Sequence, residues 1–168
     1  ETISLSNSSR PFPLMEVLAG LTREALNILS SSNCRIQIIT KSIIVARDVD
    51  ILRNVPSTVA LTITTDNDEI ASKIEPSAPK PSERLETVDA LVQGGIAVTV
   101  RIDPIIPFVN SESKALIAEI AELGVKHVTV STYKVRSRDW ERLAATMPQI
   151  AQKLRQLYWS EGEHANSY

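Results

Sequence analysis

The stretch "IAVTVRIDPIIP", residues 96–107, decides how the rest of the chain is interpreted. Its apolar and polar positions alternate: Val98, Val100 and Ile102 against Thr99, Arg101 and Asp103. Successive side chains of a β-strand point to opposite faces, so this strand has one apolar and one polar face. The polar face is directed either at water or at a polar interior. The polar positions of the other strands indicate which of these two environments applies.

Four more segments have the composition of strands, and helical patterns separate them. The strand-like segments are "TISLS" (2–6), "RIQIIT" (35–40), "TVALTITT" (58–65) and "VKHVTVST" (125–132). Helices are expected within 21–32, 47–55, 81–95, 110–124 and 138–159, the last divided by Pro148. Strands that alternate with helices indicate βαβ units and parallel strands. We therefore predict a single α/β domain over residues 1–168.

The other strands repeat the division into two faces. Thr62 and Thr64 alternate with apolar residues, Ser131 does the same near the end of 125–132, and Lys41 shares its parity with Gln37. Strand threonines can simply reflect β-propensity, and Arg101 with Asp103 can be an isolated structural pair. A sheet covered by helices on both faces, however, would bury unpaired charges at a cost of several kcal/mol each.

A parallel partial barrel resolves this conflict, with helices outside and a polar lumen that holds a hydrophilic ligand. Active sites of such barrels lie at the carboxyl ends of the strands. Lys41, Thr64, Asp103 and Ser131 all fall at or near those ends. The pattern therefore predicts a ligand site there.

Composition limits the remaining classes. The net charge of −2 shows no excess of basic residues such as proteins use to bind a nucleic-acid backbone. A local basic patch is still compatible with this composition. Cys34 is the single cysteine, which excludes an internal disulfide and fits a reducing, cytoplasmic compartment. No apolar run approaches the ~20 residues that span a bilayer. Because the chain begins at Glu1, we expect a fragment or a processed product.

A conventional barrel enzyme with general acid–base chemistry ranks third among the functional hypotheses. His127 is its candidate base, but this residue lies early in its strand, away from the carboxyl end. The sequence contains no Gly-rich phosphate loop, no paired-histidine metal spacing and no serine nucleophile elbow.

Three segments resemble a known family: "ITKS" (39–42), "KIEPSAPKPSERLETVDALVQGGIAVTVRIDPIIP" (73–107) and "STYKVRSRDWERLAATMPQIAQKLRQLYW" (131–159). They look like the radical S-adenosylmethionine (radical SAM) proteins related to spore photoproduct lyase, often labelled DNA repair photolyases. The resemblance covers nearly the whole chain in the right order. It implies a partial TIM-type barrel, of which this chain forms about five βα units, strands two to six.

The resemblance also implies cofactors for the intact protein. Family members hold a [4Fe–4S] cluster on a Cys-x-x-x-Cys-x-x-Cys loop and cleave S-adenosylmethionine (SAM) to a 5′-deoxyadenosyl radical. This sequence has no such loop, and Cys34 is interpreted as a small buried hydrophobe. The intact protein is thus expected to be a lyase-like radical SAM enzyme, whereas the 168-residue chain alone is expected to be inactive. The substrate is unknown, and the family suggests DNA.

Matching positions to the family gives candidate cofactor-binding residues. Lys41 matches a lysine near the SAM ribose or carboxylate, and Thr62 a hydroxyl-bearing position that faces the cofactor, followed on the same side by Thr64. Ser9 matches the Thr of a "T-D-P-Y" turn, in which Arg10 here replaces the aspartate.

The later strands supply further candidates. Arg101 and Asp103 lie in the segment that matches the family's fifth strand, at the place where that strand meets cofactor or substrate. Ser131 lies near the end of the last strand-like segment. Glu75 and Arg84 are expected to organise the Pro-rich loop. Tyr133, Lys134 and Arg136 follow the last strand, where they are expected to line a substrate entrance or to contact phosphate. Glu16 matches a glutamate farther along the same turn as Ser9, or is solvated.

A second hypothesis is a non-catalytic nucleic-acid-binding or repair-associated module. "TYKVRSRDWER" (132–142) places four cations, Lys134, Arg136, Arg138 and Arg142, near Tyr133 and Trp140. Such a patch can contact phosphates and stack bases. A basic run beside acidic residues is also typical of a solvated helix face.

Overall fold

A computed structural model describes residues 1–5 and 15–159 of the 168-residue chain. These residues contain one sheet of five parallel strands in the order β1-β2-β3-β4-β5. The strands are β1 (Thr2–Leu5), β2 (Arg35–Thr40), β3 (Ser57–Thr62), β4 (Ala97–Ile105) and β5 (His127–Thr132). Spatial order equals sequence order, as expected when each crossover places the next strand beside the previous one. The predicted parallel α/β class is confirmed.

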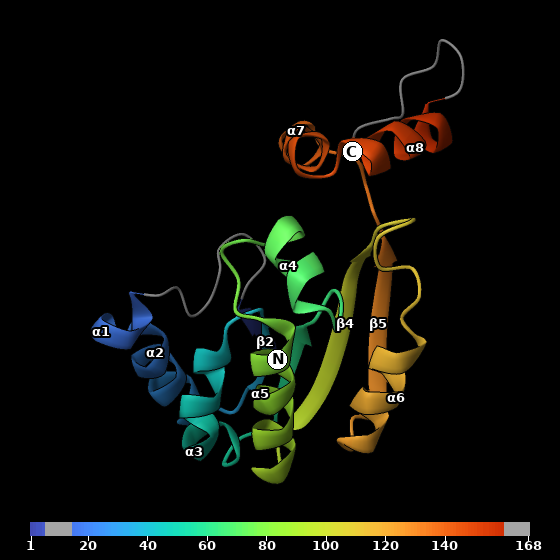
Figure 1. Ribbon diagram of the computed structural model, residues 1–168. Coiled ribbons are helices and arrows are strands. Elements are labelled where there is room, and N and C mark those ends of the chain that lie inside the picture. Colours follow the sequence, from blue (N-terminus) through green and yellow to red (C-terminus); the bar gives the residue numbers. More distant parts are fainter. Residues whose placement is uncertain (6–14, 160–168) are drawn as a thin grey trace.

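Helices fill every connection between the strands (Figure 1). They are α1 (Glu16–Ala19), α2 (Leu21–Ser30), the 3₁₀ helix η1 (Ile43–Asp48), α3 (Val49–Leu52), α4 (Asp68–Ile74), α5 (Pro81–Gln93), α6 (Lys114–Glu122), α7 (Ser137–Thr146) and α8 (Pro148–Tyr158). Pro148 divides α7 from α8 as predicted, because proline is tolerated at a helix start but not in its interior. No helix in residues 1–5 and 15–159 is long and apolar enough to cross a membrane.

Three elements differ from expectation. α4 was not predicted from the sequence, although the Asn67 side chain caps it by accepting a hydrogen bond from the backbone N–H of Ile70. The strand expected over 58–65 ends earlier, as β3 at Thr62, so Thr64 lies after the strand, whereas β4 extends to Ile105 and contains Asp103.

The main core lies on one face of the sheet. Strand residues of a single parity are buried there, together with Ile63 directly after β3: Ile36, Ile38, Val59, Leu61, Val98, Val100 and Ile102. They pack with residues of α2, η1, α3, α5 and α6, namely Leu26, Val45, Leu52, Val88, Leu91, Leu116 and Ile120. The helices between the strands therefore cover the apolar face, as the alternation predicts.

Helix α5 ends in close contact with α3. A Cβ atom built on Gly94 would lie 2.5 Å from Cγ1 of Val49, well inside van der Waals contact. Only glycine fits this position without movement of the valine.

A second, smaller cluster lies beyond the carboxyl ends of the strands. It contains Ile74, Ile106, Tyr133, Leu143, Ala151 and Leu154. Figure 1 shows α7 and α8 above the upper ends of β4 and β5, away from the helices that cover the sheet. This helical hairpin is thus placed at the end of the sheet where parallel α/β proteins bind ligands.

Candidate functional site

The polar residues of neighbouring strands lie in register. Thr62 of β3 pairs with Arg101 of β4, which pairs with Thr129 of β5. In parallel strands, residues that pair directly point to the same face. The polar positions of these three strands therefore form a row across the sheet, opposite the face that the helices cover.

Three predicted site residues meet at the carboxyl end of β4 and β5. Arg101 Nη2 lies 2.5 Å from Asp103 Oδ2, and the Ser131 hydroxyl donates to Asp103 Oδ1. The Arg101 and Asp103 side chains are 28% and 30% exposed. Arg101 and Asp103 are therefore not an isolated ion pair. With Ser131 they form a three-residue group that spans two strands.

Lys41, directly after β2, is held by a carboxylate from a distant loop. Its ammonium lies 2.8 Å from Oε1 of Glu75, which follows α4. The other oxygen, Oε2, lies 2.7 Å from Nη2 of Arg84 in α5. Burial by itself raises the pKa of Glu75, but the charges of Lys41 and Arg84 outweigh it and lower this pKa.

Arg84 connects this ion group to the sheet. It is fully buried, its Nε donates to the Pro79 carbonyl and its Nη1 to the Thr62 carbonyl, each at 2.8 Å. A buried guanidinium is stable only when its donors are satisfied, and here all three nitrogens have acceptors. The expectation that Glu75 and Arg84 organise the Pro-rich loop is confirmed, and the same contacts fix the end of β3.

Thr62, the last residue of β3, and Thr64, two residues after it, are both buried at the carboxyl end of the sheet. Thr62 is 4% exposed, and Thr64 is fully buried with a hydroxyl that has no hydrogen-bond partner among the described residues. Asn110 fastens the neighbouring backbone: its Nδ2 donates to the carbonyls of Thr64 and Pro104, and its Oδ1 accepts from Ile106 N–H. The tips of β3 and β4 are therefore tied together by one side chain.

Glu16 is neither on the polar face nor solvated. It is 3% exposed, and its carboxylate accepts from the backbone N–H groups of Thr22 and Arg23 at 2.9 and 3.2 Å. Arg47 Nη2 lies 2.9 Å from the same carboxylate. Burial opposes ionisation, but the N–H of Thr22 and the Arg47 guanidinium outweigh it and lower the pKa to about 2. Glu16 therefore holds the start of α2 against η1.

The remaining candidate residues do not belong to the polar group around Asp103. Ser9 and Arg10 lie outside the described residues. Tyr133 is 6% exposed and packs under α7 and α8, so the expectation that it lines an entrance is wrong. His127 begins β5, at the amino end of the sheet, and does not approach the group around Asp103.

The residues present fit one of the two expected cofactors. No three His, Cys, Asp or Glu side chains within residues 1–5 and 15–159 come together as metal ligands. Cys34 packs against the main core and donates its thiol to the Leu29 carbonyl at 3.6 Å. An iron–sulfur cluster therefore does not fit the described residues. A polar nucleoside cofactor does fit them, because cations, hydroxyls and an unpaired buried Thr64 hydroxyl gather at the carboxyl end of the strands.

Comparison with other sequences gives relatives without a stated function. No family model matches the chain. An uncharacterized protein of Mycobacterium tuberculosis is 26% identical over an alignment of 169 residues, covering 94% of this chain and 50% of that protein. An uncharacterized protein of Acidianus two-tailed virus is 31% identical over 129 residues, with 72% and 43% covered. The chain spans about half the length of the curated relatives it matches.

Comparison with solved structures supports the fold. A spore photoproduct lyase variant with bound AdoMet (SAM) and dinucleoside spore photoproduct superposes with a TM-score of 0.67 at 13% identity. The match covers 88% of this chain and 45% of that one. A second variant of the same enzyme gives a TM-score of 0.66 at 14% identity. The five-stranded parallel sheet with interleaved helices thus resembles the radical SAM core.

Proposed function

We propose that the polar face at the carboxyl ends of β2 to β5 binds SAM, and that the intact protein is a radical SAM enzyme. One observation carries the proposal: Arg101, Asp103 and Ser131 contact one another at the carboxyl end of β4 and β5, Thr62 of β3 pairs with Arg101, and Lys41 directly follows β2 at the same end of the sheet. The likeness of the fold to a protein solved with bound AdoMet supports it. Clustering of charged and hydroxyl groups at this end is what binding sites of parallel α/β proteins have in common.

The chemistry of each group fits a part of the cofactor. SAM combines an α-amino acid, a ribose and an adenine. The Lys41 ammonium suits the carboxylate, and the Thr62 and Ser131 hydroxyls suit the ribose. Asp103 accepts hydrogen bonds and, with Arg101, offers a fixed charge pair to an amino group or a hydroxyl. Thr64, whose hydroxyl has no hydrogen-bond partner within residues 1–5 and 15–159, is the buried position at which a polar ligand atom or a water would be bound.

In the intact enzyme, cleavage of SAM would supply a 5′-deoxyadenosyl radical for hydrogen abstraction. The [4Fe–4S] cluster that such cleavage needs would be held by residues outside those described. This chain would then contribute cofactor binding and orientation.

Calorimetric titration of the chain with S-adenosylhomocysteine, which needs no cluster, tests the proposal. Binding that Asp103→Asn and Thr62→Val weaken, and that the exposed Lys126→Met leaves unchanged, is the expected result. Absence of binding, or equal weakening by Lys126→Met, would contradict it.

A DNA substrate is a separate proposal. Lys134, Arg136 and Arg142 are exposed around the start of α7, next to the carboxyl end of the sheet. The aromatic contribution is smaller than the sequence suggests, since Tyr133 is buried and Trp140 packs on Trp159 with ring centroids 4.8 Å apart. Fluorescence anisotropy with labelled oligonucleotides tests DNA binding, whether by the enzyme or by a non-catalytic module. Affinity that falls steeply with salt is expected.

A further inference from the structure

Lys41, Glu75 and Arg84 form an ion group at the carboxyl end of the sheet, and its members differ in burial and in the number of their partners. We propose that Glu75 and Arg84 are positioning residues that hold the Lys41 ammonium at the carboxyl end of β2 for an anionic group of the ligand. Arg84 keeps Glu75 neutralised while Lys41 turns to that group. The inference rests on the proposed function, because it concerns the amino-acid carboxylate of SAM.

Lys41 and Arg84, the two cations of this group, differ in how freely their side chains can move. The Lys41 side chain is 40% exposed, and its ammonium is 2.8 Å from Glu75 Oε1. The Arg84 side chain is fully buried and directed to three acceptors. Lysine carries its charge on a flexible stem, whereas a guanidinium with all three nitrogens engaged is fixed. Lys41 can therefore change partner, and Arg84 cannot.

The position of Glu75 between them makes that change possible. Its side chain is 8% exposed, so a lone carboxylate here would be poorly solvated. Each oxygen has its own cation, Oε1 with Lys41 and Oε2 with Arg84. If Lys41 rotates toward a ligand, the Arg84 pair at 2.7 Å stays in place. An ammonium has three donors, so Lys41 can also bind the ligand and Glu75 together.

Because Arg84 also donates to the Thr62 carbonyl, the ion group and the candidate ribose-binding hydroxyl are parts of one rigid unit. Displacement of Glu75 changes where Lys41 lies, but Thr62 keeps its contact with Arg84. The inference therefore predicts that Glu75 affects the carboxylate end of the ligand and not its nucleoside end.

Two ligands separate these ends: S-adenosylhomocysteine, and 5′-methylthioadenosine, which lacks the amino-acid carboxylate. We expect Glu75→Gln and Lys41→Met each to weaken S-adenosylhomocysteine binding about tenfold, an effect of one good charged contact. Methylthioadenosine binding should stay unchanged. Lys41→Arg should restore part of the carboxylate binding, and the exposed Glu122→Gln serves as the matched control. In the double variant, Glu75→Gln should add nothing to Lys41→Met.

Equal loss for both ligands in Glu75→Gln would show a merely structural role and overturn the inference. So would an unchanged affinity in Lys41→Met. Circular dichroism establishes that each variant is folded, and Glu75→Asp is the second variant if Glu75→Gln is not. Glu75→Asp keeps the charge and leaves the Arg84–Thr62 contact in place, but its shorter side chain cannot hold Lys41 and Arg84 as Glu75 does, so the same selective loss is expected.

A measurement without ligand separates this inference from the proposed function. In the free protein, the ¹⁵N order parameter of the Lys41 ammonium should fall in Glu75→Gln and in Arg84→Lys. An unchanged order parameter would overturn the positioning role, whatever the ligand result. If wild-type protein binds neither ligand while the order parameter falls, the proposed function is wrong and Lys41 is positioned for a different anion.

Discussion

The Ser131 hydroxyl donates to the Asp103 carboxylate across the β4–β5 pair, on the sheet face opposite the main core. Arg101 contacts the other oxygen of the same carboxylate. One acidic side chain thus fixes a cation of its own strand and a hydroxyl of the next. This relationship joins the two strands through side chains where their ladder is irregular, between Ile102 and Ile105.

Removal of the hydroxyl should weaken this end of the sheet. Ser131→Ala should lower the free energy of unfolding by about 1 kcal/mol, the usual value of one hydrogen bond. Urea denaturation measures it, and the exposed Ser111→Ala is the control. In a double-mutant cycle with Asp103→Ala, the two losses should not add, because both changes remove the hydrogen bond between Ser131 and Asp103. Strict additivity would contradict the shared-carboxylate geometry.

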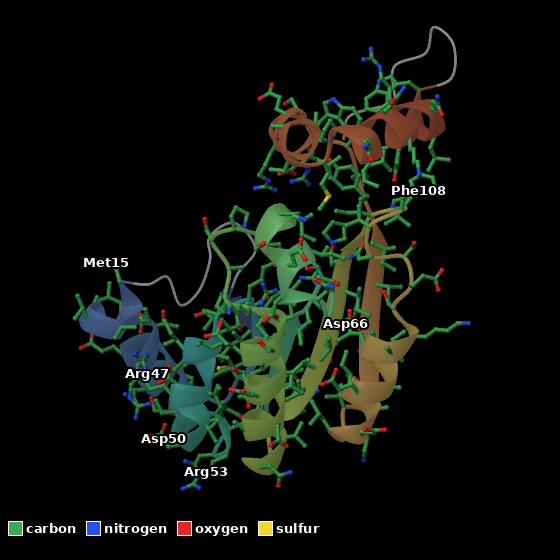
Figure 2. The ribbon with its side chains drawn as sticks, viewed as in Figure 1. Met15, Arg47, Asp50, Arg53, Asp66 and Phe108 are labelled. Atoms are coloured by element: carbon green, nitrogen blue, oxygen red, sulfur yellow. The ribbon has the colours of Figure 1, made fainter. Side chains whose placement is uncertain are left out.

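Arg84 should be the most sensitive charged position among the described residues. Arg84→Met leaves Glu75 with Lys41 alone and the carbonyls of Pro79 and Thr62 without their donor. Breaking a buried pair typically costs about 3–5 kcal/mol. The control is Arg53→Met, since Arg53 is exposed at the lower end of α3 (Figure 2) and a change there should stay within about 0.5 kcal/mol. Equal effects of the two variants on urea denaturation would be inconsistent with the burial of Arg84.

Glu16 should make stability depend on acid pH. Its pKa in the folded protein is about 2, below the ordinary 4.5, so protons bind the unfolded chain more tightly. The stabilisation is present above pH 4.5 and is lost as the pH falls from 4.5 toward 2. Urea unfolding at several pH values should therefore show a smaller acid-induced loss in Glu16→Gln than in the wild type. Parallel curves for the two proteins would show that Glu16 does not ionise differently on folding.

The contact between Gly94 and Val49 predicts a paired substitution. Gly94→Ala places a Cβ 2.5 Å from Cγ1 of Val49, and such overpacking typically costs about 1–3 kcal/mol. Val49→Ala removes the clashing methyl group, so the double variant should be more stable than Gly94→Ala alone. Thermal unfolding compares the four proteins. A double variant less stable than either single variant would mean that α5 does not approach α3 in this way.

The two-residue period of the strands was sufficient to predict which side chains share the polar face. Thr62 and Arg101 have the predicted parity, and their register follows because parallel strands in sequence order align their carboxyl ends. Ser131 came into the group for the same reason. The alternation of side chains along a strand depends only on local backbone geometry, so it can be predicted without knowledge of the fold.

Partners across loops could not be predicted in this way. Lys41 and Glu75 are 34 residues apart, and nothing in "ITKS" indicates which carboxylate meets the ammonium. Glu16 was expected either on the cofactor side or in solvent, and its sequence neighbours give no sign of its partner Arg47, 31 residues away. Tyr133 was placed at an entrance because it follows a strand, but α7 and α8 fold back over it. In each case tertiary packing determines the environment, and the sequence pattern does not contain it.

Asn110 carries a consequence for how such a protein can diversify. Because a single amide spans the Thr64 and Pro104 carbonyls and the Ile106 N–H, the spacing of two adjacent strand tips is set beneath the surface segments. The turn of residues 106–110, which exposes Phe108 at the top of β4 (Figure 2), is part of this arrangement, whereas segments that make none of these hydrogen bonds can change in length or composition without moving those tips. Under the proposed function, substrate selectivity can then change in the outer segments while the spacing of the strand ends that would bind the cofactor stays the same.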